Sequence, residues 1–315
     1  MGHGSHGIMR VKEYLGDLKS GRTVSGAKLK IIHETPSSMT IDAQKGVGQT
    51  IMPELLERMR AKLSSQAVVT AAVQNSGHIG RIGEWVEKPA YAGYPGLLLV
   101  NDNGTFFCVA PPGGKQAVTS TNPVAFAIPL PEGEIFLTDM STSAIAFGKV
   151  KLARLNSKQV PQDSIQDADG NETTDPNALF TNPPGSIMAM GGSQAYKGFA
   201  LSMFVDLLVS GLSGGHTPPA PEGVTYANNL VLTLWNPEFF SGLRHMQDEA
   251  KKYIAFVRAS PPTDASKPVR LAGDRMHAVR TDRESEGIPL DEGLTISLIN
   301  LARELKIEIP KELVR

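Results

Sequence analysis

Two histidines lie in glycine-rich turns, where an imidazole could exchange a proton with a ligand. His78 stands in residues 75–83, a run with glycines three residues apart, and His6 stands between Ser5 and Gly7. Glycine lets the backbone turn with positive φ and lets a flat ligand come close, because it has no Cβ. Imidazole titrates near neutral pH, so it can act as a general acid or base. A plain tight turn around a partly buried histidine is the alternative, and the pattern alone leaves both open.

The flanking residues predict the elements that hold these histidines. The apolar run 67–73 predicts a buried strand that ends shortly before His78. Helical spacing follows, with Trp85 and Val86 among charged residues, so His78 lies where a strand passes into a helix. The free N–H groups at a helix start also favour an anion. Apolar residues at helical spacing over residues 8–18 predict a helix, and Ser5 is a candidate for its N-cap.

Composition excludes several classes of protein. Among 315 residues, 31 basic and 32 acidic side chains nearly cancel, which argues against a nucleic-acid or anionic membrane partner. The single cysteine, Cys108, excludes a disulfide framework and predicts a cytoplasmic location. The seven histidines are scattered and form no HExxH, so we expect no metal site. We also expect no membrane-spanning segment, because the apolar runs are short.

The glycine spacing does not match the common nucleotide-binding loops. No GxGxxG follows a predicted strand and no GxxxxGK[ST] occurs, so a Rossmann site is disfavoured and a P-loop is excluded. Residues 211–215 do fit the hydrolase pattern GxSxG, with Ser213 as the candidate nucleophile. That pattern requires a preceding strand, whereas Ser213 follows a predicted helix and is more simply a cap residue. A serine hydrolase therefore stays open as an alternative of a different class.

Two other stretches have more than one interpretation. The apolar helix predicted over residues 199–212 is expected to be buried nearly all round. Lys197, at its start, is either an end charge at the surface or an anion ligand. Residues 167–171 combine Asp and Asn with a glycine, as calcium loops do. However, the glycine comes too early and the closing glutamate is missing, so we expect a turn.

Taken together, these stretches resemble the type-2 malate/L-lactate dehydrogenase family, non-Rossmann oxidoreductases that use NAD(P). The resemblance covers essentially the whole chain and follows the order of the family. Residues 78–83, 236–239 and 267–268 are most similar to its hydroxycarboxylate dehydrogenase B branch. The matching stretches are residues 5–7, 75–83, 121–126, 139–149, 196–199 and 287–291.

The resemblance implies a role for each matched residue. His6, oriented by Ser5, resembles the acid/base histidine of the family, and His78 holds the position given that role in other members. Arg10 resembles the arginine that binds the substrate carboxylate through two parallel hydrogen bonds. The residues that match cofactor-binding positions are Gly80, Arg81, Ile82, Thr138, Asp139, Met140, Ser141, Tyr196, Lys197, Gly198, Leu271, Ala272 and Gly273.

The resemblance also implies the fold and the reaction. It implies an α/β, non-Rossmann fold with a helical lobe formed by both termini (residues 1–50 and 245–315) and a large lobe with a mixed or antiparallel sheet that binds the cofactor (residues 51–244). The family's additional N-terminal helices would be missing. The implied activity interconverts small 2-oxo and 2-hydroxy acids with NAD or NADP, in a homodimer. A cyclic ketimine reductase of the same fold is the close alternative.

Overall fold

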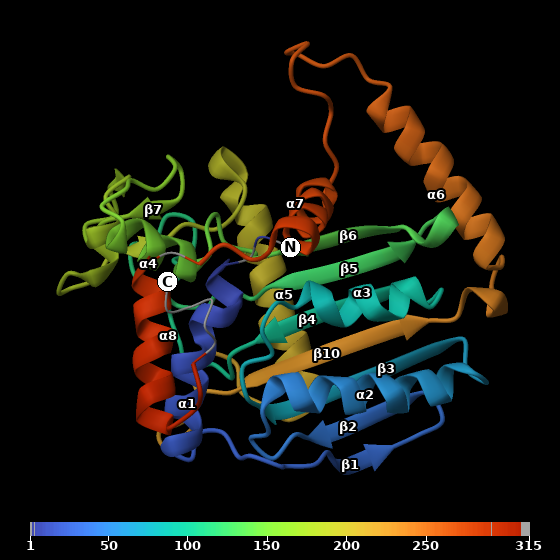
Figure 1. Ribbon diagram of the computed structural model, residues 1–315, viewed down its shortest axis with the longest axis horizontal. Coiled ribbons are helices and arrows are strands. Elements are labelled where there is room, and N and C mark those ends of the chain that lie inside the picture. Colours follow the sequence, from blue (N-terminus) through green and yellow to red (C-terminus); the bar gives the residue numbers. More distant parts are fainter. Residues whose placement is uncertain (1, 3, 291, 310–315) are drawn as a thin grey trace.

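The computed structural model describes residues 2, 4–290 and 292–309, and a mixed seven-stranded sheet runs through it (Figure 1). Neighbouring strands are antiparallel except β2 and β3, which are parallel. This pairing differs from the parallel sheet of a Rossmann fold, as predicted. In spatial order the strands are β1 (Lys30–Glu34), β2 (Ser38–Asp42), β3 (Val68–Ser76), β10 (Asn228–Trp235), β4 (Gly96–Asn101), β5 (Val124–Pro129) and β6 (Ile135–Met140).

Helices cover both faces of this sheet, because its strands are apolar on both sides. Helices α2 (Gly48–Leu63) and α3 (Gly83–Tyr91) lie on one face, and α5 (Ala195–Ser213) lies on the other (Figure 1). Successive side chains of β10 pack on opposite faces of the sheet. Leu230 and Leu232 belong to the core under α2 and α3, while Val231 packs with α5. The sheet is therefore the middle layer of three.

Helix α5 is less buried than its composition predicts. With the preceding η5 (Gly192–Gln194) it is long and apolar enough to cross a membrane, which the short apolar runs did not suggest. Val205 and Val209 are fully buried against the sheet, but Phe204 and Leu207 are 50% and 60% exposed. The prediction of burial nearly all round is wrong, because the sheet covers only one side of this helix.

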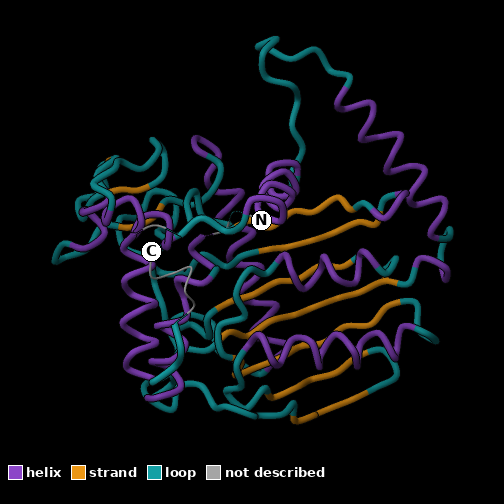
Figure 2. The backbone as a smooth tube through the Cα atoms, in the orientation of Figure 1, coloured by secondary structure: helices purple, strands orange, loops and turns teal. Residues whose placement is uncertain are grey.

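The remaining helices surround the ends of the sheet (Figures 1 and 2). Helices α1 and α8 lie side by side, joined by an ion pair between Lys19 and Glu304. The longer helices are α1 (Val11–Lys19), α4 (Phe147–Leu155), α6 (Leu243–Arg258), α7 (Asp274–Glu286) and α8 (Glu292–Leu305). The short 3-10 helices are η1 (Gly4–His6), η2 (Ile8–Arg10), η3 (Pro131–Gly133), η4 (Pro176–Phe180) and η6 (Pro237–Phe239).

A second, three-stranded sheet lies beside α4 and has the order β8 (Glu172–Thr173), β7 (Ile165–Gln166), β9 (Ser186–Ile187). Between β7 and β8, the Asp167 side chain accepts hydrogen bonds from the backbone N–H groups of Asp169 and Asn171. Residues 167–171 thus form the expected turn. Strands β1 and β2 fall inside the predicted helical lobe 1–50 but extend the main sheet, so a lobe boundary would lie near residue 29. The division into two lobes remains a prediction.

The topology gathers several loops at one edge of the main sheet. The end of β3 is next to the start of β10, the end of β4 and the start of β5, because these strands are antiparallel neighbours. The end of β6 also lies at this edge, opposite the start of β5. Segments that precede or follow these strands are therefore brought together, although they lie far apart in the sequence.

Candidate active site

Two adjoining cavities open at this edge of the sheet. The first has a volume of about 400 Å³ and is lined by His6, Arg10 and His78 among other residues. The second has a volume of about 310 Å³ and is lined by Gly80, Arg81 and Asp139 among others. The residues that line both cavities are His6, Gly80, Ile82, Thr121, Pro123 and Ala146. A ligand in one cavity would therefore share a wall with a ligand in the other.

His78 follows β3, in the turn that the glycines predict. The Gly80 N–H donates to its Nδ1 at 3.2 Å, and the Tyr14 hydroxyl lies 2.8 Å from the same atom. Since an N–H can only donate, Nδ1 is unprotonated, and Tyr14 donates to it as well. Gln49 in turn donates to the Tyr14 oxygen at 3.1 Å. These bonds fix the tautomer of neutral His78 with its proton on Nε2.

The surroundings of His78 favour its neutral form. Burial, followed by the positive charges of Arg10 and His6, lowers the pKa of His78 from 6.5 to about 3. The rings of His6 and His78 stack with centroids 5.6 Å apart and planes 24° from parallel. The two imidazoles, 72 positions apart in the sequence, therefore lie together in the structure. The Ser5 side chain, predicted to orient His6, lies outside the described part of the structure.

The lowered pKa of His78 predicts a loss of stability in mild acid. Its folded value, about 3, is below the ordinary 6.5, so the unfolded chain takes up the proton first as the pH falls. This stability is fully present above the unfolded pKa and is lost as the pH falls toward the folded one. Between pH 7 and pH 5, wild type should lose about 2 kcal/mol more of its free energy of unfolding than His78→Gln. Urea unfolding of both proteins measures this difference, and equal losses would contradict it.

Arg10 and Tyr14 reach the same region from the N-terminal segment. His6, Arg10 and Tyr14 are four residues apart, a spacing that places side chains on one side of a helical segment. Arg10 lines the first cavity and pairs with Glu13 at 2.7 Å, with 22% of its side chain exposed. One short segment, η1–η2–α1, thus supplies an imidazole and a guanidinium to the cavity and a hydroxyl to His78.

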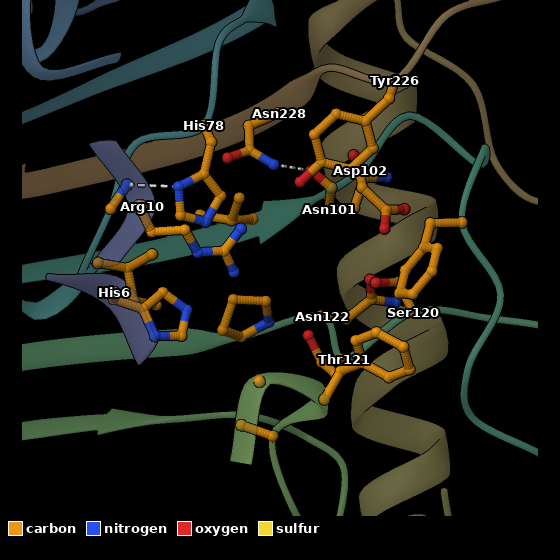
Figure 3. Close-up of a pocket in the computed structure, with 18 of the residues that line it drawn as sticks. His6, Arg10, His78, Asn101, Asp102, Ser120, Thr121, Asn122, Tyr226 and Asn228 are labelled. Carbon is orange, nitrogen blue, oxygen red and sulfur yellow. Dashed lines mark hydrogen bonds between the residues drawn. The ribbon is translucent and has the colours of Figure 1, made fainter. Parts of the chain in front are cut away.

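Asn228, at the start of β10, holds the turn that contains His78. Its Oδ1 accepts a hydrogen bond from the Ile79 N–H at 3.1 Å, and its Nδ2 donates to the Asn101 carbonyl at 3.4 Å (Figure 3). Sequence reasoning missed Asn228, because nothing local marks it. Its effect depends on the register that pairs Asn228 with Ser76.

The opposite wall of the first cavity carries a buried carboxyl group. Figure 3 shows Asp102, Ser120 and Tyr226 across the cavity from His6, His78 and Arg10. Asp102 is only 6% exposed, and burial raises its pKa to about 7, together with the charge of Asp206 and against a hydrogen bond from Ser120. No local sequence pattern indicates that this side chain faces a cavity.

Beneath this wall, a polar cluster joins α5 to the loops. The Asp206 carboxylate accepts hydrogen bonds from the Thr119 hydroxyl at 2.6 Å, from Asn122 Nδ2 at 2.6 Å and from Asn101 Nδ2 at 3.1 Å. Asp206 is thus well bonded, and its buried charge holds the cavity floor in place. Asn122, in the stretch 121–126 used for the resemblance, belongs to this floor.

Six of the thirteen predicted cofactor residues line the second cavity: Gly80, Arg81, Ile82, Asp139, Met140 and Ser141. Gly80 has a φ of +74°, which suits glycine in the turn. Asp139 accepts a hydrogen bond from the Gly83 N–H at 2.9 Å, while burial raises its pKa. Arg81 is paired with the buried Glu87, so its charge is already engaged by an acidic neighbour.

The other predicted cofactor residues lie outside the linings of both cavities. Tyr196 and Lys197 are exposed at the start of α5, with the Lys197 ammonium over the Tyr196 ring. Gly198 is buried, and a Cβ there would come within 2.2 Å of the Met190 carbonyl oxygen, so α5 packs tightly at this point. Thr138 is buried in β6, and Leu271, Ala272 and Gly273 precede α7. Among the described residues that line the second cavity, the lysine is Lys149 and not Lys197.

Ser213 does not form a nucleophilic site. It is 1% exposed at the C-terminal end of α5, and its Oγ accepts a hydrogen bond from the Gly215 N–H at 3.2 Å. Gly214 follows in the left-handed conformation that ends helices. Ser213 is therefore a cap residue. Among the described residues, no group of three or more His, Cys, Asp or Glu side chains could hold a metal ion.

The first cavity brings two imidazoles together beside an arginine. Residues 1–298 match the malate/L-lactate dehydrogenase family. The chain is 32% identical to hydroxycarboxylate dehydrogenase B of Escherichia coli (strain K12), over 99% of this chain and 85% of that protein. It is also 32% identical to a Delta(1)-pyrroline-2-carboxylate/Delta(1)-piperideine-2-carboxylate reductase of Pseudomonas putida, over 91% of this chain and 82% of that protein.

A solved structure shows the same fold. Malate dehydrogenase from Pyrococcus horikoshii OT3 aligns with a TM-score of 0.85 at 26% identity, over 98% of this chain and 85% of that one. The chain belongs to the malate/L-lactate dehydrogenase family, and it is therefore an oxidoreductase. The predicted family, its α/β fold and the similarity to hydroxycarboxylate dehydrogenase B are confirmed.

Proposed function

We propose that the protein is an NAD(P)-dependent oxidoreductase that interconverts a 2-oxo acid and the corresponding 2-hydroxy acid. The observation that carries this proposal is the convergence of His6, His78 and Arg10 on one cavity, with His6 also lining the next. An arginine can bind the substrate carboxylate, and an imidazole can exchange a proton with the oxygen on C2. Both functional groups of such a substrate would therefore have a partner in the cavity.

The second cavity fits the nicotinamide end of a dinucleotide. A glycine turn at Gly80 leaves room for a flat ring, and Ser141 and Asp139 offer polar groups beside it. Lys149 supplies a positive charge for a phosphate at the same cavity. A bound nicotinamide would supply or accept the hydride at C2. Tyr196, Lys197, Gly198, Thr138 and residues 271–273 stay proposed cofactor contacts from the family resemblance.

The two histidines suit different tasks. His78 is held neutral, and with Nδ1 occupied by Gly80 and Tyr14 it can donate only from Nε2. It would polarise the C2 carbonyl by donating a hydrogen bond to its oxygen. His6 would carry the proton, giving it to that oxygen in reduction and taking it from the hydroxyl in oxidation. Arg10 would hold the carboxylate, and so would fix C2 beside both rings.

Incubation with NADH or NADPH and a panel of small 2-oxo acids tests this function. We expect the reduced nucleotide to be consumed with at least one 2-oxo acid. The decrease in the absorbance of NADH or NADPH measures this consumption. A protein that binds the nucleotide but turns over no member of the panel would count against the proposal. Oxidation of the 2-hydroxy acids with NAD⁺ or NADP⁺ tests the same function in the reverse direction.

A cyclic ketimine reductase is the second candidate. The similarity to the Pseudomonas putida reductase favours it, since the substrates in that protein's name carry a carboxylate beside a C=N bond. The same arginine could hold that carboxylate, and reduction of C=N and C=O asks for a similar arrangement of groups. Comparing pyruvate with a cyclic ketimine carboxylate separates the two functions, and a strong preference for the ketimine would establish the second.

We also propose a homodimer in the cytoplasm, with α5 and α6 as the surfaces that join two copies. Both helices present large apolar side chains to solvent, including Phe204 and Leu207 on α5 and Tyr253 and Phe256 on α6. Phe204 and Leu207 are three residues apart, as are Tyr253 and Phe256, so each helix has its own strip of exposed apolar surface, which favours an interface. The single cysteine, Cys108, is buried and agrees with a reducing compartment.

Placing a charge on α5 should break this dimer. Leu207→Glu puts a carboxylate in the centre of the apolar face, and we expect dissociation to rise by about tenfold or more because the charge loses water on association. Sedimentation equilibrium measures the change. Leu155→Glu is the control, because Leu155 is 78% exposed at the end of α4 and belongs to neither α5 nor α6. A monomeric wild type, or equal dimers in both variants, would refute the assignment.

A further inference from the structure

The most informative group that the mechanism leaves unused is the Asp102 carboxyl. It follows the last residue of β4 and lines the first cavity, yet it is 6% exposed. Among the ion pairs between described residues, none includes Asp102. A carboxylate buried without a cation is costly unless something hydrogen-bonds to it.

The carboxylate of Asp102 accepts fewer hydrogen bonds from the protein than the carboxylate of its neighbour Asp206. Three side chains donate to Asp206 from inside the fold, whereas Asp102 accepts from the hydroxyl of Ser120 and from its own backbone N–H. A carboxylate can accept about four hydrogen bonds. Asp102 therefore keeps acceptor capacity, and its position in the lining directs that capacity to the cavity.

Asp102 lies where the end of the substrate farthest from C2 would be bound. Arg10 and the two imidazoles lie on one side of the cavity, and Asp102 lies on the other with Tyr226 and Ser120 (Figure 3). If the carboxylate and C2 of the substrate occupy the first side, its remaining carbons extend toward Asp102. A second carboxylate at that end would meet a like charge, and a hydrogen-bond donor would meet an acceptor.

We infer that Asp102 selects 2-hydroxy and 2-oxo acids whose far end carries a hydrogen-bond donor, such as an amide, a hydroxyl or an ammonium group, over dicarboxylic acids. This inference rests on the proposed function, since it places the substrate by Arg10 and the histidines. It makes Asp102 a specificity residue that takes no part in proton transfer. The relatives named for malate would then differ from this protein in their preferred substrate.

Malate and its 4-amide provide a matched pair, because they differ only in the group at the far end. Both are assayed as substrates for oxidation at pH 8.5, where Asp102, with a pKa of about 7, is ionised. Wild type should prefer the amide in kcat/KM by about tenfold or more. In Asp102→Asn the preference should fall to near one, because an amide side chain can donate to a carboxylate and accept from an amide.

Asp264→Asn is the matched control. Asp264 pairs with Lys267 outside the linings of both cavities, so removing its charge should leave the preference unchanged. Nucleotide binding by each variant checks that it is folded. An equal preference in wild type and Asp102→Asn, a wild-type preference for malate, or oxidation of lactate without oxidation of the amide overturns the inference alone. Failure to oxidise lactate or any other 2-hydroxy acid overturns the proposed function, and the inference with it.

Discussion

Replacing His6 by asparagine should lower kcat by about 10²–10⁴-fold, because the C2 oxygen loses the group that exchanges its proton. Asparagine keeps a polar side chain of similar size, so the cavity and the nucleotide site should persist. Binding of NADH, followed by its fluorescence, should change little. The rate of the wild type should vary with pH as one group titrates, and the variant should lose that dependence. Steady-state kinetics across the pH range measures both effects.

His78→Gln is the control for this prediction. Glutamine can still donate a hydrogen bond to the C2 oxygen, so the variant should keep more activity than His6→Asn, and it should keep the pH dependence. The opposite result would reverse the roles of the two rings. In that case the proton would pass through His78, with Tyr14 as the group that relays it, since their atoms lie 2.8 Å apart.

Replacing Arg10 by methionine should raise KM for the 2-oxo acid by about 10²-fold, with a smaller change in kcat. Two charge-assisted hydrogen bonds to the carboxylate are lost, and the nearby Glu13 loses the partner that neutralises it. Arg10→Lys should recover part of the loss, because lysine keeps the charge but not the planar fork. Saturation curves for the acid at fixed nucleotide concentration measure these effects.

Lys12→Met is the control for Arg10, since Lys12 is exposed on the same segment and its loss changes the net charge equally. Its KM should match that of the wild type. If Arg10→Met and Lys12→Met raise KM by the same factor, the arginine would act only through the general field of the protein. The substrate carboxylate would then have another partner in the cavity.

The parts of this site that follow from local sequence were predictable. The strand, glycine turn and helix around His78 depend on residues within about ten positions of it, and they appear as expected in β3, the turn and α3. The stacking of His6 on His78 could be expected only through the family resemblance, because no local pattern relates residues so far apart.

The residues that were missed depend on pairing between distant segments. Asn228 acts on the His78 turn because β10 pairs with β3, and Asp102 faces the cavity because β4 ends at the same edge. Tyr14 lies within the apolar stripe predicted over residues 8–18, and only its spacing of four from Arg10 indicates a second role. The burial of α5 was overestimated for a different reason, since apolar composition does not distinguish a core from a surface that another copy could cover.

The spacing of His6, Arg10 and Tyr14 has a mechanical consequence. Because one short stretch of backbone carries all three, a small rotation of that stretch about its own axis would move them together. The grip on the carboxylate, the proton carrier and the support of His78 would then be gained or lost in a single motion. Such an arrangement behaves as one cooperative unit, so partial displacement of the stretch should switch the enzyme off instead of weakening it step by step.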